Sequence, residues 1–235
     1  SIDKDGVYGV KTTYQTFPLG DSGGSTYDSG CSKYSYKTSE GNFGPHIGEG
    51  INQGALNELR CLSGEGDGAK DIFNDKLAII HGVAATPEIM ATMAEKGSKL
   101  IWSPRSNISL YGDTAIAPLY DRLGVTITLG TDWTPSGSMN ILRELQCADF
   151  LNTYYYNKHF IDYDLWRMVT YNAAEAFGLT SVVGQLKAGL HADIAMYRKT
   201  PTRQQHRAII DAEPQDVLLV MIDGKVIYGE SSAVA

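Results

Sequence analysis

The sequence lacks the features that mark membrane proteins, disulfide-rich domains and nucleic-acid-binding proteins. No apolar run approaches the roughly 20 residues that a membrane-spanning helix needs. Only three cysteines occur, Cys31, Cys61 and Cys147, and no CxxC pair is present, so neither a disulfide framework nor a zinc knuckle is expected. The net charge is −7 without a Lys/Arg-rich run, which argues against nucleic acid and membrane surfaces as partners.

The first residues lack both an initiator methionine and the apolar core of a secretory signal. Together with the few cysteines, this favours a reduced, cytoplasmic protein. It also suggests that a segment preceding Ser1 has been removed.

Strand-like and helix-like segments alternate through most of the chain. An extended segment at 8–17 and an irregular loop come first. Such alternation is typical of parallel βαβ units. Apolar strands are predicted at 43–46, 77–80, 99–102 and 125–129, and helices at 55–59, 87–95, 116–123, 140–156 and 165–177.

After Gly178 the pattern changes to short β segments. Strands are predicted at 192–197, 217–222 and 226–228, and Asp223-Gly224 between the last two is a strong hairpin signal. We therefore divide the chain into an α/β body, residues 1–180, and a small β-sandwich appendage, residues 181–235.

The number of strand–helix units is too small for a closed barrel. A complete (β/α)8 TIM barrel needs about 250 residues, and only four clear units lie between Phe43 and Phe177. Four strands cannot close and would leave exposed edges. The chain is therefore predicted to be the second half of a larger enzyme, carrying strands four or five to eight.

Three polar residues lie where predicted strands end. His46 and His81 end two of them, and Asp132 follows a third. In parallel α/β folds the carboxyl ends of the strands carry the active site. Histidine and aspartate are also metal ligands, so the pattern predicts a metal site at this edge.

The ordered motifs resemble the amidohydrolase superfamily, in particular its cytosine deaminase and triazine hydrolase branch. His46-x-x-Glu49 resembles the end of the family's fifth barrel strand, and His81 the end of the sixth. Residues 103–107 resemble the Ser-Asn loop after the seventh strand, and Gly130-Thr131-Asp132 the end of the eighth. The resemblance spans about residues 43–230, and the order of the motifs makes it specific.

One family motif is absent. The family's first strand carries a His-x-His pair of metal ligands, whereas the five histidines of this chain include no such pair. If the resemblance holds, that half is expected upstream of Ser1 or on a separate segment.

The resemblance implies a role for each of the four polar residues. His46 and Asp132 would hold one divalent transition metal, zinc or iron, which activates a water molecule. Asp132 would accept the proton of that water, and Glu49 would pass a proton to the substrate. His81 would orient the attacking water or bind a second metal. We favour one metal, because no bridging carboxylate candidate is evident.

Three further residues are candidates for substrate binding. Arg105 and Asn107 either contact substrate or tie loops together. Trp133 either lines the pocket or belongs to the start of the following helix.

The predicted function is metal-dependent hydrolysis of a C–N bond in a small cyclic or aromatic nitrogen compound. The favoured reaction is deamination of a nucleobase-like substrate. The second candidate reaction is ring opening of a cyclic amide, as in imidazolonepropionase-like relatives. The alternative to an enzyme is a non-catalytic or incomplete homologue that lacks the His-x-His metal motif. A small molecule is the expected partner, and assembly as a homodimer is expected.

One protease-like motif is interpreted as a loop. Residues 20–24 around Ser22 resemble the nucleophile motif of chymotrypsin-like proteases, but no histidine precedes Ser22 and an α/β pattern follows it. A glycine-rich loop is the better interpretation.

Overall fold

The computed structural model describes residues 7–15, 25–34 and 41–231. Its main sheet consists of five parallel strands in the order β1-β2-β3-β4-β5. The predicted parallel α/β architecture is therefore confirmed, and the extended segment at 8–17 contributes the edge strand. Ser22 lies outside the described residues. The strands are β1 (Thr12–Gln15), β2 (Asn42–Ile47), β3 (Ala78–His81), β4 (Lys99–Trp102) and β5 (Ile127–Leu129).

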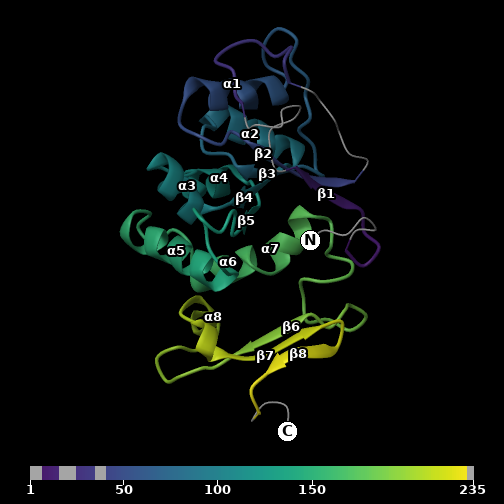
Figure 1. The fold of residues 1–235 in the computed structure, drawn as a ribbon, viewed down its shortest axis with the longest axis vertical. Helices are drawn as coiled ribbons and strands as arrows, with labels where there is room; N and C mark the ends of the chain where they lie inside the picture. The colour runs from purple at the N-terminus through teal and green to yellow at the C-terminus, as the bar shows by residue number, and fades with distance from the viewer. Residues whose placement is uncertain (1–6, 16–24, 35–40, 232–235) are drawn as a thin grey trace.

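Helices connect the strands and pack around the sheet (Figure 1). Local sequence signals explain several of their ends. Thr86 caps the start of α2 and Gly97, with φ 71°, ends it in the left-handed conformation that favours glycine. The helices are α1 (Gln53–Leu62), α2 (Pro87–Lys96), α3 (Pro104–Tyr111), α4 (Ala117–Leu123), α5 (Ile141–Tyr154), α6 (Asp162–Met168) and α7 (Tyr171–Ala176).

Two predicted segments differ from the structure. Residues 103–107 do not form a loop, because Pro104 begins helix α3. The single helix predicted at 165–177 is two helices, α6 and α7. The break falls at Val169 and Thr170, where the Thr170 hydroxyl donates to the carbonyl oxygen of Trp166 at 2.9 Å. β-Branched residues and this local hydrogen bond both weaken helix continuity.

The carboxyl-terminal segment forms a separate antiparallel sheet of β6 (Ile194–Tyr197), β7 (Val217–Ile222) and β8 (Lys225–Gly229). Asp223 and Gly224 both have positive φ, as the predicted two-residue hairpin turn requires. The sheet lies at the end of the molecule away from α1 and α2 (Figure 1). A short helix, α8 (Arg207–Ile210), connects β6 to β7 together with a 3-10 turn, Pro214–Asp216.

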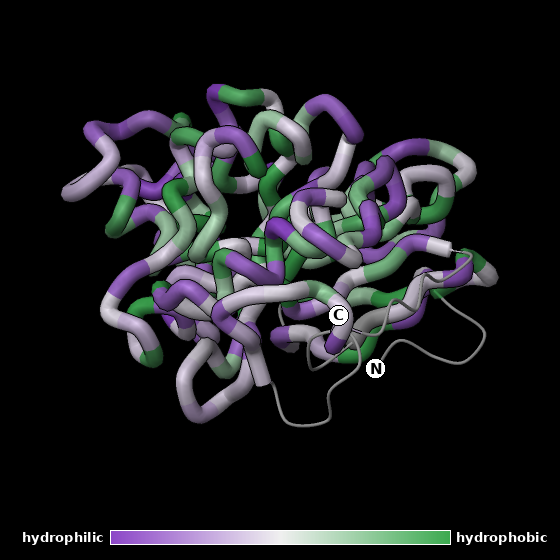
Figure 2. Tube along the Cα trace, turned by 90° about the horizontal axis from the view of Figure 1, so that it is seen from above, coloured by the Kyte–Doolittle hydropathy of each residue, from purple (hydrophilic) through white to green (hydrophobic). Residues whose placement is uncertain are grey.

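The hydrophobic core lies between the parallel sheet and its helices. Ile47, Leu59, Met93 and Leu100 are fully buried there, and Ile210 of α8 joins the same cluster. Apolar segments accordingly run through the middle of the chain trace, and polar segments lie mostly at its periphery (Figure 2). The main core therefore also anchors the carboxyl-terminal segment.

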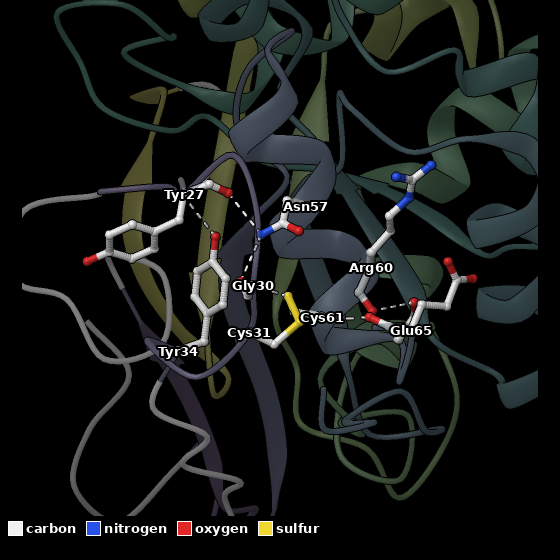
Figure 3. Close-up of a disulfide and its surroundings, with 9 residues drawn as sticks. Tyr27, Gly30, Cys31, Tyr34, Asn57, Arg60, Cys61 and Glu65 are labelled. Atoms are coloured by element: carbon white, nitrogen blue, oxygen red, sulfur yellow. Dashed lines mark hydrogen bonds between the residues drawn. A yellow bond between two sulfur atoms is a disulfide. The ribbon is translucent and has the colours of Figure 1, made fainter. Parts of the chain in front are cut away.

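The expectation of no disulfide is wrong, because Cys31 and Cys61 are bonded to each other. The bond attaches the segment 25–34 to helix α1, and both residues are buried (Figure 3). Beside it, the Asn57 side chain donates to the carbonyl oxygens of Tyr27 and Gly30. The pairing could not be read from the sequence, because it depends on how the chain returns to α1.

The disulfide also removes one argument for a cytoplasmic location. Structural disulfides are uncommon in the cytosol of most organisms, so the cytoplasmic location stays a prediction without support from cysteine usage. Among the described residues, no helix is both long enough and apolar enough to pass through a membrane.

Candidate active site

His46, His81 and Asp132 meet at the carboxyl edge of the parallel sheet. His46 is the penultimate residue of β2, His81 is the last residue of β3, and Asp132 lies just beyond β5. The Nε2 atoms of His46 and His81 each lie 3.9 Å from an Asp132 carboxylate oxygen. The centroids of the two imidazole rings are 5.1 Å apart. The sheet therefore brings together three residues that are far apart in sequence.

Two of these residues have an unusual backbone conformation. His81 has φ 78° and Asp132 has φ 53°, in the left-handed region that non-glycine residues rarely adopt. Such conformations persist only where surrounding contacts enforce them, and they cluster at functional sites. Both residues lie at or just beyond the carboxyl end of a strand, and their side chains approach each other in the site.

Glu49 joins the site because the chain turns sharply at Gly48. Gly48 has φ 65°, and a side chain there would lie 2.5 Å from Leu59. Its amide donates to the buried Glu58 carboxylate at 2.8 Å. The turn places Glu49 Oε2 3.5 Å from His81 Nε2. The Tyr111 hydroxyl of α3 donates to the other oxygen, Oε1, at 2.8 Å.

The loop that carries Asp132 is held by a second buried carboxylate, Glu144 of α5. Glu144 accepts from the Ser138 hydroxyl and, at 3.0 Å, from the backbone amide of Arg105. Gly137 permits close packing, since a side chain there would lie 2.0 Å from the carbonyl oxygen of Thr131. Residues 131–138 are thus tied to both α3 and α5.

The electrostatics of the site favour an ionised Asp132 beside a neutral His81. Burial alone would raise the pKa of Asp132, but polar contacts with His46 and Ser106 hold it well below its usual range. Burial lowers the pKa of His81, and this effect outweighs the opposing influence of the Glu49 and Asp132 carboxylates. The site therefore places an ionised Asp132 carboxylate beside an uncharged His81 imidazole.

The donor set suits a divalent transition metal. One ligand atom from each of His46, His81 and Asp132 lies within 4.8 Å of the others. Metal–ligand distances near zinc are about 2.0–2.2 Å, so one ion can contact two atoms that are 3.9 Å apart. The Nε2 atom of His81 is buried without a hydrogen-bond partner in the described structure. His46 and Asp132 therefore fit the divalent metal that the sequence motifs imply, and His81 lies beside them.

The three predicted substrate-binding residues have different environments. Arg105 Nε donates to the carbonyl oxygen of Gly137 at 3.0 Å, so this side chain ties α3 to the Asp132 loop. Asn107 is fully buried and contacts His81. Trp133 is 68% exposed. Substrate contact by these three residues stays a prediction.

Sequence reasoning missed Tyr111 and Glu144, both of which support the site. Tyr111 carries no motif, and its importance arises only because α3 lies over Glu49. A buried glutamate within the apolar stretch of α5 is an unusual composition, and that signal could have drawn attention to Glu144.

A cavity of about 190 Å³ opens at the opposite end of β5. Val125, Arg167 and Asn172 are among its lining residues, and it contains none of the predicted site residues. This cavity is therefore separate from the cluster of His46, His81 and Asp132 at the carboxyl edge of the sheet.

Comparison with known proteins agrees with this geometry. Residues 39–227 match the Amidohydrolase family. A 5-methylthioadenosine/S-adenosylhomocysteine deaminase of Clostridium tetani is 30% identical over 166 residues, which cover 66% of this chain and 38% of that protein. The chain thus spans about two-fifths of the length of this curated relative.

Solved structures share the fold. A zinc-bound adenosine deaminase of Xanthomonas campestris has a TM-score of 0.69 at 21% identity, covering 81% of this chain and 46% of that one. A zinc complex of atrazine chlorohydrolase from Arthrobacter aurescens has a TM-score of 0.67 at 21% identity, covering 81% and 44%. From the match over residues 39–227 and the site that these residues build, the chain belongs to the amidohydrolase family.

Proposed function

We propose that this chain is the carboxyl-terminal half of a metal-dependent deaminase. Residues 1–180 would supply strands four or five to eight of a (β/α)8 barrel, and residues 181–235 part of a β-sandwich. Support comes from the parallel order of β1 to β5 and from structural neighbours of which the chain covers less than half. The other half would supply the remaining strands and further metal ligands.

The single observation that carries the proposal is the meeting of His46, Glu49, His81 and Asp132 at one edge of the sheet. His46 and Asp132 would hold the metal, and His81 would be positioned beside the attacking water. When bound, the metal lowers the pKa of a coordinated water toward neutrality.

Glu49 and Asp132 would divide the proton transfers. Asp132 is kept ionised and can accept a proton from the attacking water. Glu49, protonated at the outset and oriented by Tyr111, would donate its proton to the ring nitrogen and regain one from the hydroxyl of the tetrahedral carbon, while the proton held by Asp132 would pass to the departing amino group. Water oxygen replaces nitrogen on the ring carbon, and the amino group leaves as ammonia.

We propose an adenine nucleoside as the substrate class. The curated relative is named for deamination of 5-methylthioadenosine and S-adenosylhomocysteine, and one structural neighbour is an adenosine deaminase. The residues described here do not define the whole pocket, since half of a barrel's loops belong to its other half. A small-molecule partner, a homodimeric assembly and the choice between zinc and iron stay predictions.

The test is an assay of the full-length natural protein for ammonia release from 5-methylthioadenosine, S-adenosylhomocysteine and adenosine. We expect bound transition metal, loss of activity with a chelator and recovery with zinc or iron. Glu49→Gln should lower kcat by about 10²–10⁴-fold while the metal content is retained.

The matched control is Glu65→Gln, because Glu65 is exposed and lies away from the site. This variant should retain full activity. A metal-free protein without hydrolytic activity would favour the non-catalytic homologue. Activity on cyclic amides alone would favour the ring-opening alternative.

A further inference from the structure

A chain of three buried hydrogen bonds leads from the core to His81. Trp102 Nε1 lies 2.8 Å from Thr114 Oγ1, and Thr114 Oγ1 lies 3.1 Å from Asn107 Oδ1. Asn107 Nδ2 in turn lies 2.9 Å from His81 Nδ1. Trp102, Asn107 and His81 are fully buried, and Thr114 is nearly so. Water therefore does not compete for these bonds.

We propose that Trp102, Thr114 and Asn107 form a directional hydrogen-bond chain that holds His81 as the neutral tautomer with its hydrogen on Nε2. In this tautomer His81 is a hydrogen-bond donor in the site and is excluded as a metal ligand. Trp102, Thr114 and Asn107 are then positioning residues that act through His81. The consequence for the reaction rests on the proposed function, whereas the tautomer does not.

The direction begins at Trp102, whose indole N–H can only donate. The Thr114 oxygen therefore accepts from Trp102, and its own hydrogen needs another acceptor. Within the described contacts of Thr114 Oγ1, that acceptor is Asn107 Oδ1. The carbonyl of Asn107 consequently faces Thr114, and its NH2 group faces His81.

This orientation determines the state of the imidazole. Because Asn107 Nδ2 donates, His81 Nδ1 must accept with its lone pair, and a neutral ring then carries its hydrogen on Nε2. The flipped amide would require a hydrogen on Nδ1 instead. It would also leave the buried hydroxyl hydrogen of Thr114 without an acceptor, which is unfavourable.

The Nε2–H group points at the reaction centre. It lies 3.5 Å from Glu49 Oε2 and 3.9 Å from Asp132 Oδ2, and it is buried without a partner of its own. A donor placed between two carboxylates suits an attacking water that must be held and oriented. A nitrogen that carries a hydrogen has no lone pair for a metal. Judged by distance alone, His81 would be a third metal ligand beside His46 and Asp132. The direction of the hydrogen-bond chain contradicts that assignment.

The test is to record two-bond ¹H–¹⁵N correlation spectra of histidine-labelled full-length protein, metal-free and after zinc addition. His81→Gln identifies the His81 signals. We expect the Nε2–H tautomer in both states, with zinc shifting the His46 signals. Observation of the Nδ1–H tautomer, or loss of the Nε2 proton on zinc binding, would overturn the proposal.

Substitutions test the direction of the chain. Asn107→Asp replaces the donor with an acceptor, so His81 should place a hydrogen on Nδ1, and kcat should fall about tenfold or more with KM nearly unchanged. Thr114→Val removes the hydroxyl that orients Asn107, and His81 should then populate both tautomers.

Thr114→Ser is the matched control, because it keeps the hydroxyl group and should therefore show the same spectrum and kcat as the wild-type protein. The His159 signals provide an internal reference, since His159 pairs with Asp121 away from the site. A pure Nε2–H tautomer in Thr114→Val would overturn the directional chain. An inactive protein that still shows the Nε2–H tautomer would contradict the proposed function but would still support the directional hydrogen-bond chain.

Discussion

At the scale of single residues, the site depends on buried polar groups whose partners come from other elements. Glu49 illustrates this, because Gly48 turns it into the site and Tyr111 of α3 then orients its carboxylate. The residue type and its spacing from His46 were predictable from the sequence. The partner that orients it was not, since nothing in the sequence places Tyr111 near Glu49.

Tyr111→Phe tests this orientation. It removes one hydrogen bond to a charged group, a contribution of about 1.5 kcal/mol, so kcat should fall about tenfold with little change in KM. Steady-state kinetics of the full-length protein measure the effect. Tyr154→Phe is the control, because Tyr154 is 71% exposed. Equal kcat in wild type and Tyr111→Phe would contradict the orienting role.

At the scale of secondary-structure elements, the helices and strands follow local sequence signals, but the contacts between them do not. The disulfide between Cys31 and Cys61 joins a loop to helix α1 across a sequence separation of 30 residues. Loop closure of this size reduces the entropy of the unfolded chain. The bond is therefore a stabilising constraint on the segment 25–34.

Replacing both bonded cysteines by serine should lower the free energy of unfolding by about 3–4 kcal/mol. Urea denaturation without reductant measures the loss, and wild-type protein unfolded with reductant should match the double variant. Peptide mapping should find Cys31 linked to Cys61 and Cys147 as a free thiol. Three free thiols in the native protein would contradict the bond.

At the scale of the whole molecule, Arg207 ties the carboxyl-terminal segment to the α/β body. From α8 it contacts Asp149 of α5 at 2.8 Å and Asp162 of α6 through two nitrogens. The neighbouring Ile210 is buried in the main core. The β6–β8 sheet is therefore held by a partly buried ion-pair network together with apolar packing.

Arg207→Gln should destabilise the fold by about 2 kcal/mol, because it leaves two partly buried carboxylates without their cation. Thermal unfolding followed by circular dichroism measures the change. Arg143→Gln serves as the control, because that side chain is exposed on α5 and should cost less than about 0.5 kcal/mol. Equal melting temperatures for both variants would contradict a tying role for Arg207.

The sequence by itself determined the alternation of strands and helices, the hairpin at Asp223-Gly224 and the positions of His46, Glu49, His81 and Asp132. These follow from hydrophobic periodicity, turn residues and ordered motifs, all of which act over short stretches of chain. They sufficed to predict a parallel sheet with polar residues at its carboxyl edge.

Only the tertiary structure decided what surrounds those residues. The Cys31–Cys61 bond, the carboxylate anchor at Glu144 and the path from Trp102 to His81 join segments that are distant in sequence. Side-chain hydrogen bonds and disulfides depend on distances within a few tenths of an ångström. Local patterns predict which elements form, whereas such distances are set only when the elements pack together.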